Sequence, residues 1–577
     1  MNLKDFIKTG LWKCLIFLAV MVYVYASWRA NTDLTVGRFA LFMDERITFD
    51  GVKNILHPEG IQNFFWSILN GGDQRYGRSL WNSLGFISAV PEYIWGDSGQ
   101  IIASRILQSL LILGSSLIFA FGLLQNWFLR FVLVSAFLSL PYSAYYSTIP
   151  KPEPLQLIFI ALFCFFYVRK NLADGWYWIF AGLAFGTKIS TLPLFAIALL
   201  FSLISQKKSL NDWNFKKSLK TTIFYFAIGL AISVPILMLP IGLMILGEMG
   251  LKQRICQARI STRTTMLIRF LGLVAIYFLS RKYLRVWVEG TFLNTTHGAD
   301  QASINFYSWC DYFLQEWFIA PPLVTILFVV TILIFGIIFT FNFLKLSEYN
   351  PKKLGAIAIV VSGLMLNLAI FIGVHRLWGM YLFSGTALFL AGLMIMIDQL
   401  LSSTFNSKVD SLLRFLGIVL ASELLIISLI FWAPRQYLEY EQLSSRTLST
   451  EFINQYSSYK KVIEIINDYQ IKAGKTIRVV YSPSLFEPDS NKDVVIEEFW
   501  GSYVKWTDAP DFLIFHVDST PRGNPRPLDS PEYSNYLIEQ EGYALHVADN
   551  GKACSLTPCF ERQMILPNGG EILQLKK

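Results

Sequence analysis

The stretch LWKCLIFLAVMVYVYAS (11–27) decides the class of this protein, because an apolar run of this length can cross a bilayer as one helix. Similar apolar runs recur as far as residue 432. The 577 residues are 54% hydrophobic and 16% charged, whereas an ordinary soluble protein is about 25% charged. The mean hydropathy is +0.45. The sequence therefore excludes a soluble enzyme, a disordered protein and a single-pass receptor.

Charge divides the chain near residue 435. Residues 435–577 carry a net charge of −5, and residues 1–434 carry +13. Basic residues in short loops between apolar spans mark the cytoplasmic side of a membrane protein, so this excess does not indicate nucleic-acid binding. We predict a polytopic α-helical transmembrane domain over 1–434 and a small soluble α/β domain over 435–577.

Loop charges also predict the topology. Lys4, Lys8 and Lys13 precede or begin the first span, so we expect a cytoplasmic N-terminus and an uncleaved anchor. Residues 28–100 then form a long outer loop, in which Ile61–Leu69 is expected to be a short interfacial helix. Further spans are expected near 101–124, 131–148, 154–169, 266–281, 318–342, 354–373, 380–398 and 412–432, with two short helices in each of 176–205 and 221–250. The total is about 13 transmembrane helices, which places the C-terminal domain outside.

The tail has the patterns of a small α/β domain. Residues 451–471 have helical periodicity. The strands are expected at Ile477–Tyr481, Phe512–Val517 and Tyr543–Val547. Cys554 and Cys559 would lie in an oxidising compartment, where they either form a disulfide or remain two free thiols.

Four groups of ionisable residues fall on the expected outer face. Such residues are costly at a membrane edge unless they serve a site or contact water. The groups are Asp44-Glu45-Arg46, Arg75-Tyr76-Gly77-Arg78, the Lys151-Pro152-Glu153 turn, and a late group of His297, His375, Arg376 and Tyr381. We expect the carboxylates and basic residues of these groups to converge on one cavity.

The residue types in these groups suit acid–base chemistry on a phosphate-bearing substrate. Adjacent carboxylates such as Asp44 and Glu45 repel each other, and one of them can act as a base toward a hydroxyl. The fork of donors on Arg78 fits phosphate oxygens. Each group also has an ordinary explanation, namely a solvated acidic loop, contact with lipid headgroups, or prolines that end helices.

The order of these motifs resembles the GT-C superfamily of polyprenyl-phosphate-sugar-dependent glycosyltransferases. Relatives in that superfamily are the bacterial RgtA/B/C/D-like proteins, the lipid A aminoarabinose transferases and the protein mannosyltransferases. The resemblance covers roughly residues 10–435. It rests on Asp44-Glu45, Arg78-Ser79-Leu80-Trp81, Lys151-Pro152-Glu153, Gly-Leu-Ala-Phe-Gly-Thr-Lys at 182–188, and His297-Gly298.

The resemblance implies an integral-membrane hexosyl or pentosyl transferase of the cell envelope. By it, Asp44, Glu45 and Glu153 are the catalytic carboxylates, and either member of the Asp44-Glu45 pair can be the base. Arg78, Lys188 and Arg376 are candidates to bind the donor phosphate. The residues expected to line the site are Arg75, Lys151, His297, His375 and Tyr381. The base takes a proton from the acceptor, which displaces the lipid phosphate with inversion at the sugar.

The implied partners are a polyprenyl-phosphate sugar donor, the lipid bilayer, and a glycan, lipid or protein acceptor outside the membrane. The resemblance implies no certain cofactor, and whether a divalent cation takes part stays open; Asp44, Glu45, Glu153 and His297 are plausible ligands for one. The expected location is a bacterial inner membrane, with the C-terminal domain extracytoplasmic. Two alternatives stay open: a transporter or flippase of lipid-linked glycans, and a polyprenyl-linked glycan polymerase or ligase.

Overall fold

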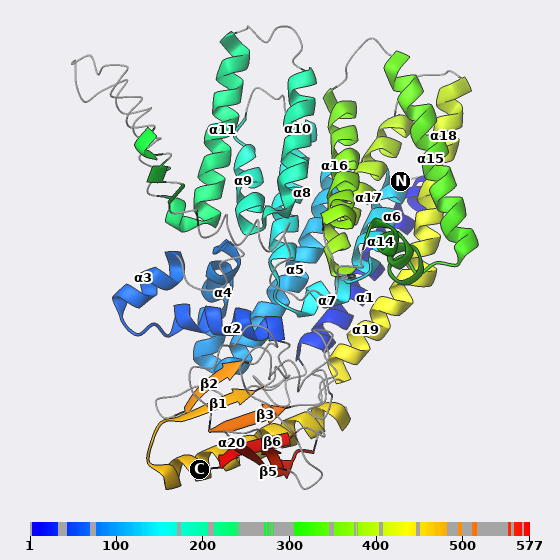
Figure 1. Ribbon diagram of the computed structural model, residues 1–577. Helices are drawn as coiled ribbons and strands as arrows, with labels where there is room; N and C mark the ends of the chain where they lie inside the picture. Colours follow the sequence, from blue (N-terminus) through cyan, green and yellow to red (C-terminus); the bar gives the residue numbers. More distant parts are fainter. Residues whose placement is uncertain are drawn as a thin grey trace, which may run out of the picture. The chain divides into compact units, whose positions relative to one another are not determined.

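The structure is a computed structural model of the chain (Figure 1). It describes residues 3–32, 43–69, 77–169, 175–205, 213–238, 305–345, 351–373, 377, 379–402, 408–445, 450–481, 494–498, 511–515, 552–554, 559–567 and 571–576, with scattered positions over 241–281.

The chain divides into two compact units. The first comprises Met1–Thr32 and Ile47–Ser444, and the second comprises Asp33–Arg46 and Ser445–Lys577. Because α18 continues through a π-helical turn directly into α19, the helical unit passes the expected boundary at 435 and ends at Ser444. The two units are described separately below.

The first unit is helical. Its α-helices are α1 (Leu3–Thr32), α2 (Met43–Leu56), α3 (Ile61–Leu69), α4 (Ser79–Trp95), α5 (Asp97–Leu123), α6 (Trp127–Ser139), α7 (Ser143–Thr148), α8 (Pro152–Arg169), α9 (Trp178–Thr187), α10 (Leu192–Ser205), α11 (Trp213–Ser233), α14 (Phe306–Tyr312), α15 (Pro322–Lys345), α16 (Pro351–Gly373), α17 (Leu382–Ser402), α18 (Lys408–Ile426) and α19 (Ala433–Ser445). Short turns complete it: the 3-10 turns η3 (Ile189–Thr191), η4 (Pro235–Leu237) and η8 (Gly379–Tyr381), and the π turns η7 (Phe313–Trp317) and η9 (Ile427–Trp432).

The first unit is that of a helical membrane protein. In the described residues, seven helices are long and apolar enough to cross a membrane. Four shorter apolar helices lie at Trp127–Ser139, Trp178–Thr187, Leu192–Ser202 and Leu219–Ser233. The expected span at 266–281 is described only at isolated positions.

Consecutive long helices run in alternating directions, so the bundle has two distinct ends. We call them the Glu153 end and the Arg169 end, after the first and last turns of α8. At the Arg169 end, both Asp398 oxygens accept from the backbone amides of Gln125 and Asn126, each at 2.9 Å. At the Glu153 end, α8 begins beside the break between α9 and α10, and α2 and α3 also lie at this end of the bundle (Figure 1).

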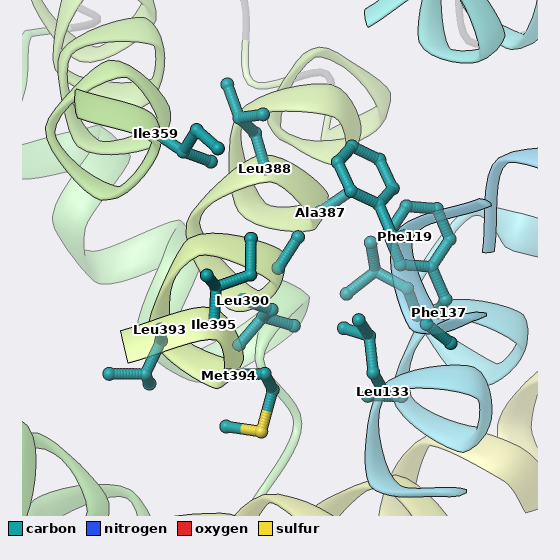
Figure 2. Close-up of a cluster of buried hydrophobic side chains, with 14 of the residues drawn as sticks. Phe119, Leu133, Phe137, Ile359, Ala387, Leu388, Leu390, Leu393, Met394 and Ile395 are labelled. Carbon is teal, nitrogen blue, oxygen red and sulfur yellow. The ribbon is translucent and has the colours of Figure 1, made fainter. Parts of the chain in front are cut away.

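Helix α17 is the centre of the bundle. It is the most buried of the seven candidate spans, with 83% of its apolar window inside the protein. Figure 2 shows its side chains Ala387, Leu390 and Met394 meeting side chains of α5, α6 and α16. Small residues on α17 allow this close approach, which is the usual way in which membrane helices pack.

The structure corrects some of the helices expected from the sequence and confirms others. The expected span at 131–148 is two helices, because Pro141 disfavours helical geometry at Leu140 and Tyr142 has a φ of 71°. The expected outer loop contains the long helix α4 as well as α3, whose bounds match the expected Ile61–Leu69. The expected break in 176–205 is present, since α9 ends just before Lys188.

The second unit contains one sheet and one long helix. The helix is α20 (Thr450–Ala473), and the strands are β1 (Ile477–Tyr481), β2 (Val494–Glu498), β3 (Phe512–Phe515), β4 (Lys552–Cys554), β5 (Cys559–Ile565) and β6 (Glu571–Lys576). The strand order is β2-β1-β3-β6-β5-β4. Strands β2, β1 and β3 are parallel, and the others pair antiparallel. The expected strand at Tyr543–Val547 lies outside the described residues.

Helix α20 covers this sheet with an apolar stripe. Val462 and Ile466 pack against Ile477, Val479 and Phe512 in one buried cluster. At the edge of the cluster, Lys475 Nζ donates to Asp511 Oδ1 at 2.7 Å, and this hydrogen bond raises the pKa of Lys475.

The two tail cysteines lie opposite each other in the sheet. Cys554 of β4 and Cys559 of β5 are register partners in an antiparallel pair. The Cα atoms of such partners are about 4.5–5.5 Å apart, which falls within the range of roughly 4.4–6.8 Å for disulfides.

We expect Cys554 and Cys559 to be joined in the oxidised protein. Peptide mass spectrometry without reduction should find the linked pair, and Cys554→Ser should leave a Cys559 thiol that reacts with maleimide. Two alkylatable thiols in protein isolated from its native membrane would contradict this prediction.

The stability of the contact between α16 and α17 should fall when a single methyl group is added at Gly363 of α16. A Cβ added at Gly363 would lie 2.5 Å from Phe389 N and 2.7 Å from Gly385 O, whereas one at Gly336 would meet nothing within 4 Å. We expect Gly363→Ala to cost roughly 1–3 kcal/mol through overpacking. Gly336→Ala should gain up to about 1 kcal/mol of helix propensity. Thermal unfolding in detergent measures both, and a Gly363→Ala midpoint at or above that of Gly336→Ala would count against the packing.

Candidate functional site

Helix α8 begins with the turn that the sequence singled out. Pro152 is its first residue, where the missing amide proton and fixed φ of proline are tolerated. Glu153 therefore falls in the first turn, where the helix dipole favours a negative charge. Lys151 precedes the helix and is partly exposed, whereas Glu153 is buried.

Glu153 forms an ion pair with Lys188. Lys188 Nζ donates to Glu153 Oε1, and the two side chains are only 15% and 10% exposed. The second carboxylate oxygen, Oε2, is buried and has no hydrogen-bond partner in the described part of the chain. The pair thus joins residues from two separate sequence motifs and leaves acceptor capacity on the carboxylate.

Lys188 lies where the chain leaves α9. Its backbone is extended, with a φ of −155°, and its amide donates to Ala184 O at 3.1 Å. Gln156 of α8 donates from Nε2 to Lys188 O at 2.6 Å and approaches Ser190 Oγ at 3.4 Å. The break between α9 and α10 is therefore fastened to the first two turns of α8.

Tyr381 brings a third element to the pair. Lys188 Nζ lies 5.6 Å from the centroid of the Tyr381 ring, which is within range of a cation–π interaction. The turn η8 that carries Tyr381 is held by two hydrogen bonds to its carbonyls: Trp317 Nε1 to Gly379 O and Tyr146 OH to Met380 O, each at 2.8 Å.

Gly379 is required by the packing of this turn. Its amide donates to Tyr312 OH at 3.2 Å. A Cβ at this position would lie 2.6 Å from atoms of Trp317, Tyr142 and Tyr312. No side chain fits without displacing one of these rings, so η8 and Tyr381 are held in place.

Arg78 is buried at the start of α4. Its Nη2 donates to Ser67 O of α3, and its Cζ lies 5.3 Å from the Trp81 ring centroid. Ser79 Oγ and Thr187 Oγ1 are hydrogen-bonded at 2.8 Å, which places the first residue of α4 beside the residue that precedes Lys188. These contacts show Arg78 joining α3 to α4; its role toward a phosphate stays a prediction.

The acidic pair lies in a helix and not in a loop. Asp44 and Glu45 occupy the first turn of α2, and Glu45 is 2% exposed. One turn further, Thr48 Oγ1 donates to Pro150 O at 3.3 Å, so α2 contacts the turn that precedes α8.

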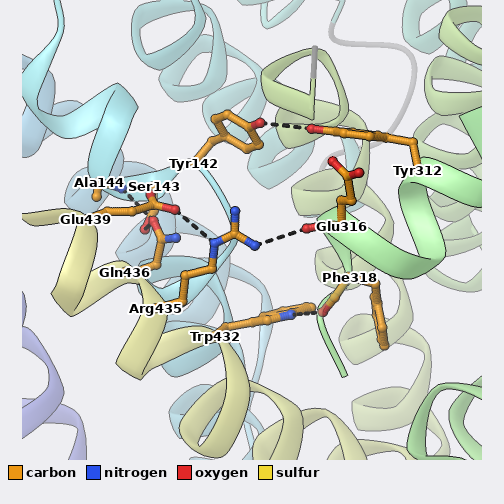
Figure 3. Close-up of polar contacts among 10 residues, drawn as sticks. All are labelled: Tyr142, Ser143, Ala144, Tyr312, Glu316, Phe318, Trp432, Arg435, Gln436 and Glu439. Atoms are coloured by element: carbon orange, nitrogen blue, oxygen red, sulfur yellow. Dashed lines mark hydrogen bonds and ion pairs between the residues drawn. The ribbon is translucent and has the colours of Figure 1, made fainter. Parts of the chain in front are cut away.

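A polar network fastens α19 at the Glu153 end, and sequence analysis did not find it. Figure 3 shows Arg435 donating to Glu439 and to the Glu316 carbonyl, at 3.1 and 3.0 Å. Three further sets of hydrogen bonds complete the network. Ser143 Oγ and Ala144 N donate to Gln436 Oε1, and Trp432 Nε1 donates to Phe318 O. The hydroxyl groups of Tyr142 and Tyr312 are hydrogen-bonded to each other. Burial and Tyr312 raise the pKa of Tyr142 well above its usual range, so its hydroxyl stays neutral.

Other predicted site residues lie outside the part of the chain that the structure describes. They are Arg75, His297, His375, Arg376 and the Asp44 side chain. The expected convergence of Asp44 and Arg376 with Glu153 therefore stays a prediction. Among the residues that were described, no group of three metal-ligating side chains occurs.

The arrangement can perform two chemical tasks. The ammonium group of Lys188 can bind an anionic phosphate, and the carboxylate of Glu153 can accept a proton or a hydrogen bond from a hydroxyl. Neither a protein-family model nor a curated protein matches the chain.

We predict that breaking the ion pair is more costly than removing either charge from a surface pair. Lys188→Met leaves the Glu153 carboxylate buried without its ion-pair partner, which should cost about 3–5 kcal/mol, and adding Glu153→Gln should restore part of the loss. The matched control is Lys53→Met, because Lys53 and Asp97 are 37% and 38% exposed and their pair is worth at most about 1 kcal/mol. Thermal unfolding in detergent compares them, and equal losses in the two single variants would refute a buried pair.

Proposed function

We propose that this chain is an integral-membrane glycosyltransferase that moves a sugar from a polyprenyl-phosphate donor to an acceptor outside the membrane. The observation that carries the proposal is the buried Glu153–Lys188 pair at one end of an apolar bundle, beside Tyr381. A carboxylate and an ammonium at the membrane edge suit a reaction between a hydroxyl acceptor and a lipid phosphate leaving group.

The proposal assigns roles to the site residues. Asp44 or Glu45 takes the proton of the acceptor, and Glu153 positions the acceptor or a divalent cation. Lys188, with Arg78 and Arg376, stabilises negative charge on the departing phosphate. One such displacement inverts the anomeric centre. Membership of the GT-C superfamily, with about 13 spans, is part of the same proposal.

The distribution of charge supports an external Glu153 end. At the Arg169 end the described helices carry basic residues that include Lys13, Arg130, Arg169, Lys408 and Arg414, and fewer carboxylates, namely Asp5, Asp398 and Asp410. At the Glu153 end acidic and basic residues are mixed. Because basic residues concentrate on the cytoplasmic side, we place the Glu153 end outside. A bacterial inner membrane and an extracytoplasmic C-terminal α/β domain are further parts of the proposal.

A transporter or flippase of lipid-linked glycans is the second candidate. The observation that favours it is Glu423, a carboxyl within the apolar helix α18, since transporters place ionisable residues near the bilayer midplane. A glycan polymerase or ligase would use the same outer site with a longer donor.

The test is transfer by the purified chain in detergent, with a polyprenyl-phosphate sugar as donor. We expect Asp44→Asn to lower turnover by about 10²–10⁴, the usual contribution of a general base. Glu153→Gln should also lower turnover, because it removes the carboxylate that positions the acceptor. Asp97→Asn, which changes an exposed carboxylate at the same end, should retain turnover.

Cells provide the matching measurement. Mass spectrometry of lipid-linked and surface glycans should show one missing sugar and accumulated donor when the chain is absent or carries Glu153→Gln. Wild-type turnover in both the Asp44→Asn and Glu153→Gln variants would refute the proposed chemistry. Vesicle translocation of the donor without transfer to any acceptor would favour the flippase.

A further inference from the structure

One carboxyl group of the bundle lies far from the site already described. Glu423 belongs to α18 and is partly buried against α15. An α-helix rises 1.5 Å per residue, so Glu423 lies about 14 Å along the axis of α18 from Trp432. By the same rise, Thr331 lies about 14 Å along the axis of α15 from Pro322. Since both reference residues are at the Glu153 end, the two side chains fall near the middle of a hydrocarbon core about 30 Å thick.

Glu423 and Thr331 contact each other across the two helices. Thr331 Oγ1 lies 3.2 Å from Glu423 Oε1 and 2.8 Å from Leu327 O. Glu423 Oε2 is buried and, among the described residues, has no hydrogen-bond partner. The residues that are described also place no cation within ion-pair distance of Glu423.

Counting protons assigns the state of the carboxyl. A threonine hydroxyl has one proton and two acceptor lone pairs. Leu327 O is a carbonyl and cannot donate, so the shorter contact uses the hydroxyl proton of Thr331. The contact at 3.2 Å between Thr331 Oγ1 and Glu423 Oε1 then has a proton of its own only when the carboxyl supplies it. An ionised carboxylate would have to compete with Leu327 O for the one hydroxyl proton.

The surroundings agree with a neutral acid. A carboxylate without a cation is strongly disfavoured in an apolar medium. The charged groups of the elements packed on α18 are distant: Lys345 ends α15, while Asp398 of α17 and Arg130 of α6 lie at the Arg169 end. On α18 itself, Arg414 lies about 14 Å away along the axis, and Lys408 and Asp410 lie further.

We propose that Glu423 and Thr331 form an intramembrane proton-binding site, in which the carboxyl group keeps its proton at neutral pH and donates it to Thr331 Oγ1. The site links α15 to α18. It is also a modification site for lipophilic carbodiimides, which react with protonated carboxyl groups. The acid adds across a C=N bond of the carbodiimide, and the acyl group then shifts from oxygen to nitrogen, giving an N-acylurea with no leaving group.

The first test is labelling of the full chain with dicyclohexylcarbodiimide in lipid vesicles at neutral pH, followed by peptide mass spectrometry. Glu464 of α20 is the internal control, because its side chain is 63% exposed and its Oε2 lies 3.0 Å from Lys461 Nζ. We expect the adduct on Glu423 to exceed that on Glu464 by at least about tenfold, since an ordinary glutamate has a pKa of about 4.3. An absent adduct on Glu423, or equal labelling of the two, overturns the proposal.

The second test separates protonation from simple packing. In Glu423→Gln the amide is neutral and can donate to Thr331 Oγ1 as the acid does, so the midpoint of thermal unfolding should equal that of the wild type. Thr331→Val removes the acceptor and should lower the midpoint, whereas Thr331→Ser should not. A fall in Glu423→Gln as large as that in Thr331→Val would show that the carboxyl is ionised, and would overturn the proposal.

Discussion

The ion pair between Glu153 and Lys188 is the constraint on which the Glu153 end of the bundle depends. Neither charge can remain alone in apolar surroundings, so the start of α8 and the break after α9 must meet. Gln156 then fastens the same break through the Lys188 carbonyl. A helix start, which is easily frayed elsewhere, is therefore one of the fixed points of this protein.

Aromatic side chains hold the turn next to this pair in place. Tyr381 lies against Lys188, and its turn is held by Trp317 and Tyr146 through backbone carbonyls. These carbonyls belong to a turn between two membrane helices, where no regular hydrogen-bond ladder is available to satisfy them. The same indole and phenol groups that fill space therefore complete the hydrogen bonding of the backbone.

Much of the fold follows from the sequence because membrane spans are long and uniform. The apolar runs placed α5, α8, α15 and α16 within a few residues, and Lys188 marked the break after α9, since a cation rarely sits inside a short apolar helix. The helical state of Asp44 and Glu45 was not foreseen, because α2 is too polar to show a span and too short for a strong periodic signal.

The site was predictable only in part. The motif that contains Glu153 and the one that contains Lys188 were both selected, but nothing in their separate patterns pairs them. Gln156 carried a usable signal, since it is a polar residue in an apolar helix one turn after Glu153. One of the two contacts of Arg435 is to the Glu316 carbonyl of η7, and side-chain patterns contain no information about which backbone carbonyls lack a partner in a fold.

The crowding around Gly379 has an evolutionary consequence. Two tyrosines and a tryptophan from two distant segments close on this single position, Tyr142 from one and Tyr312 with Trp317 from the other, so a larger residue there would require simultaneous change in the rings. Substitution by single steps is thereby blocked, and glycine at 379 should covary with tryptophan at 317 across divergent homologues. Such a coupled pair is a marker by which distant members of this lineage can be found even after most of the apolar sequence has drifted.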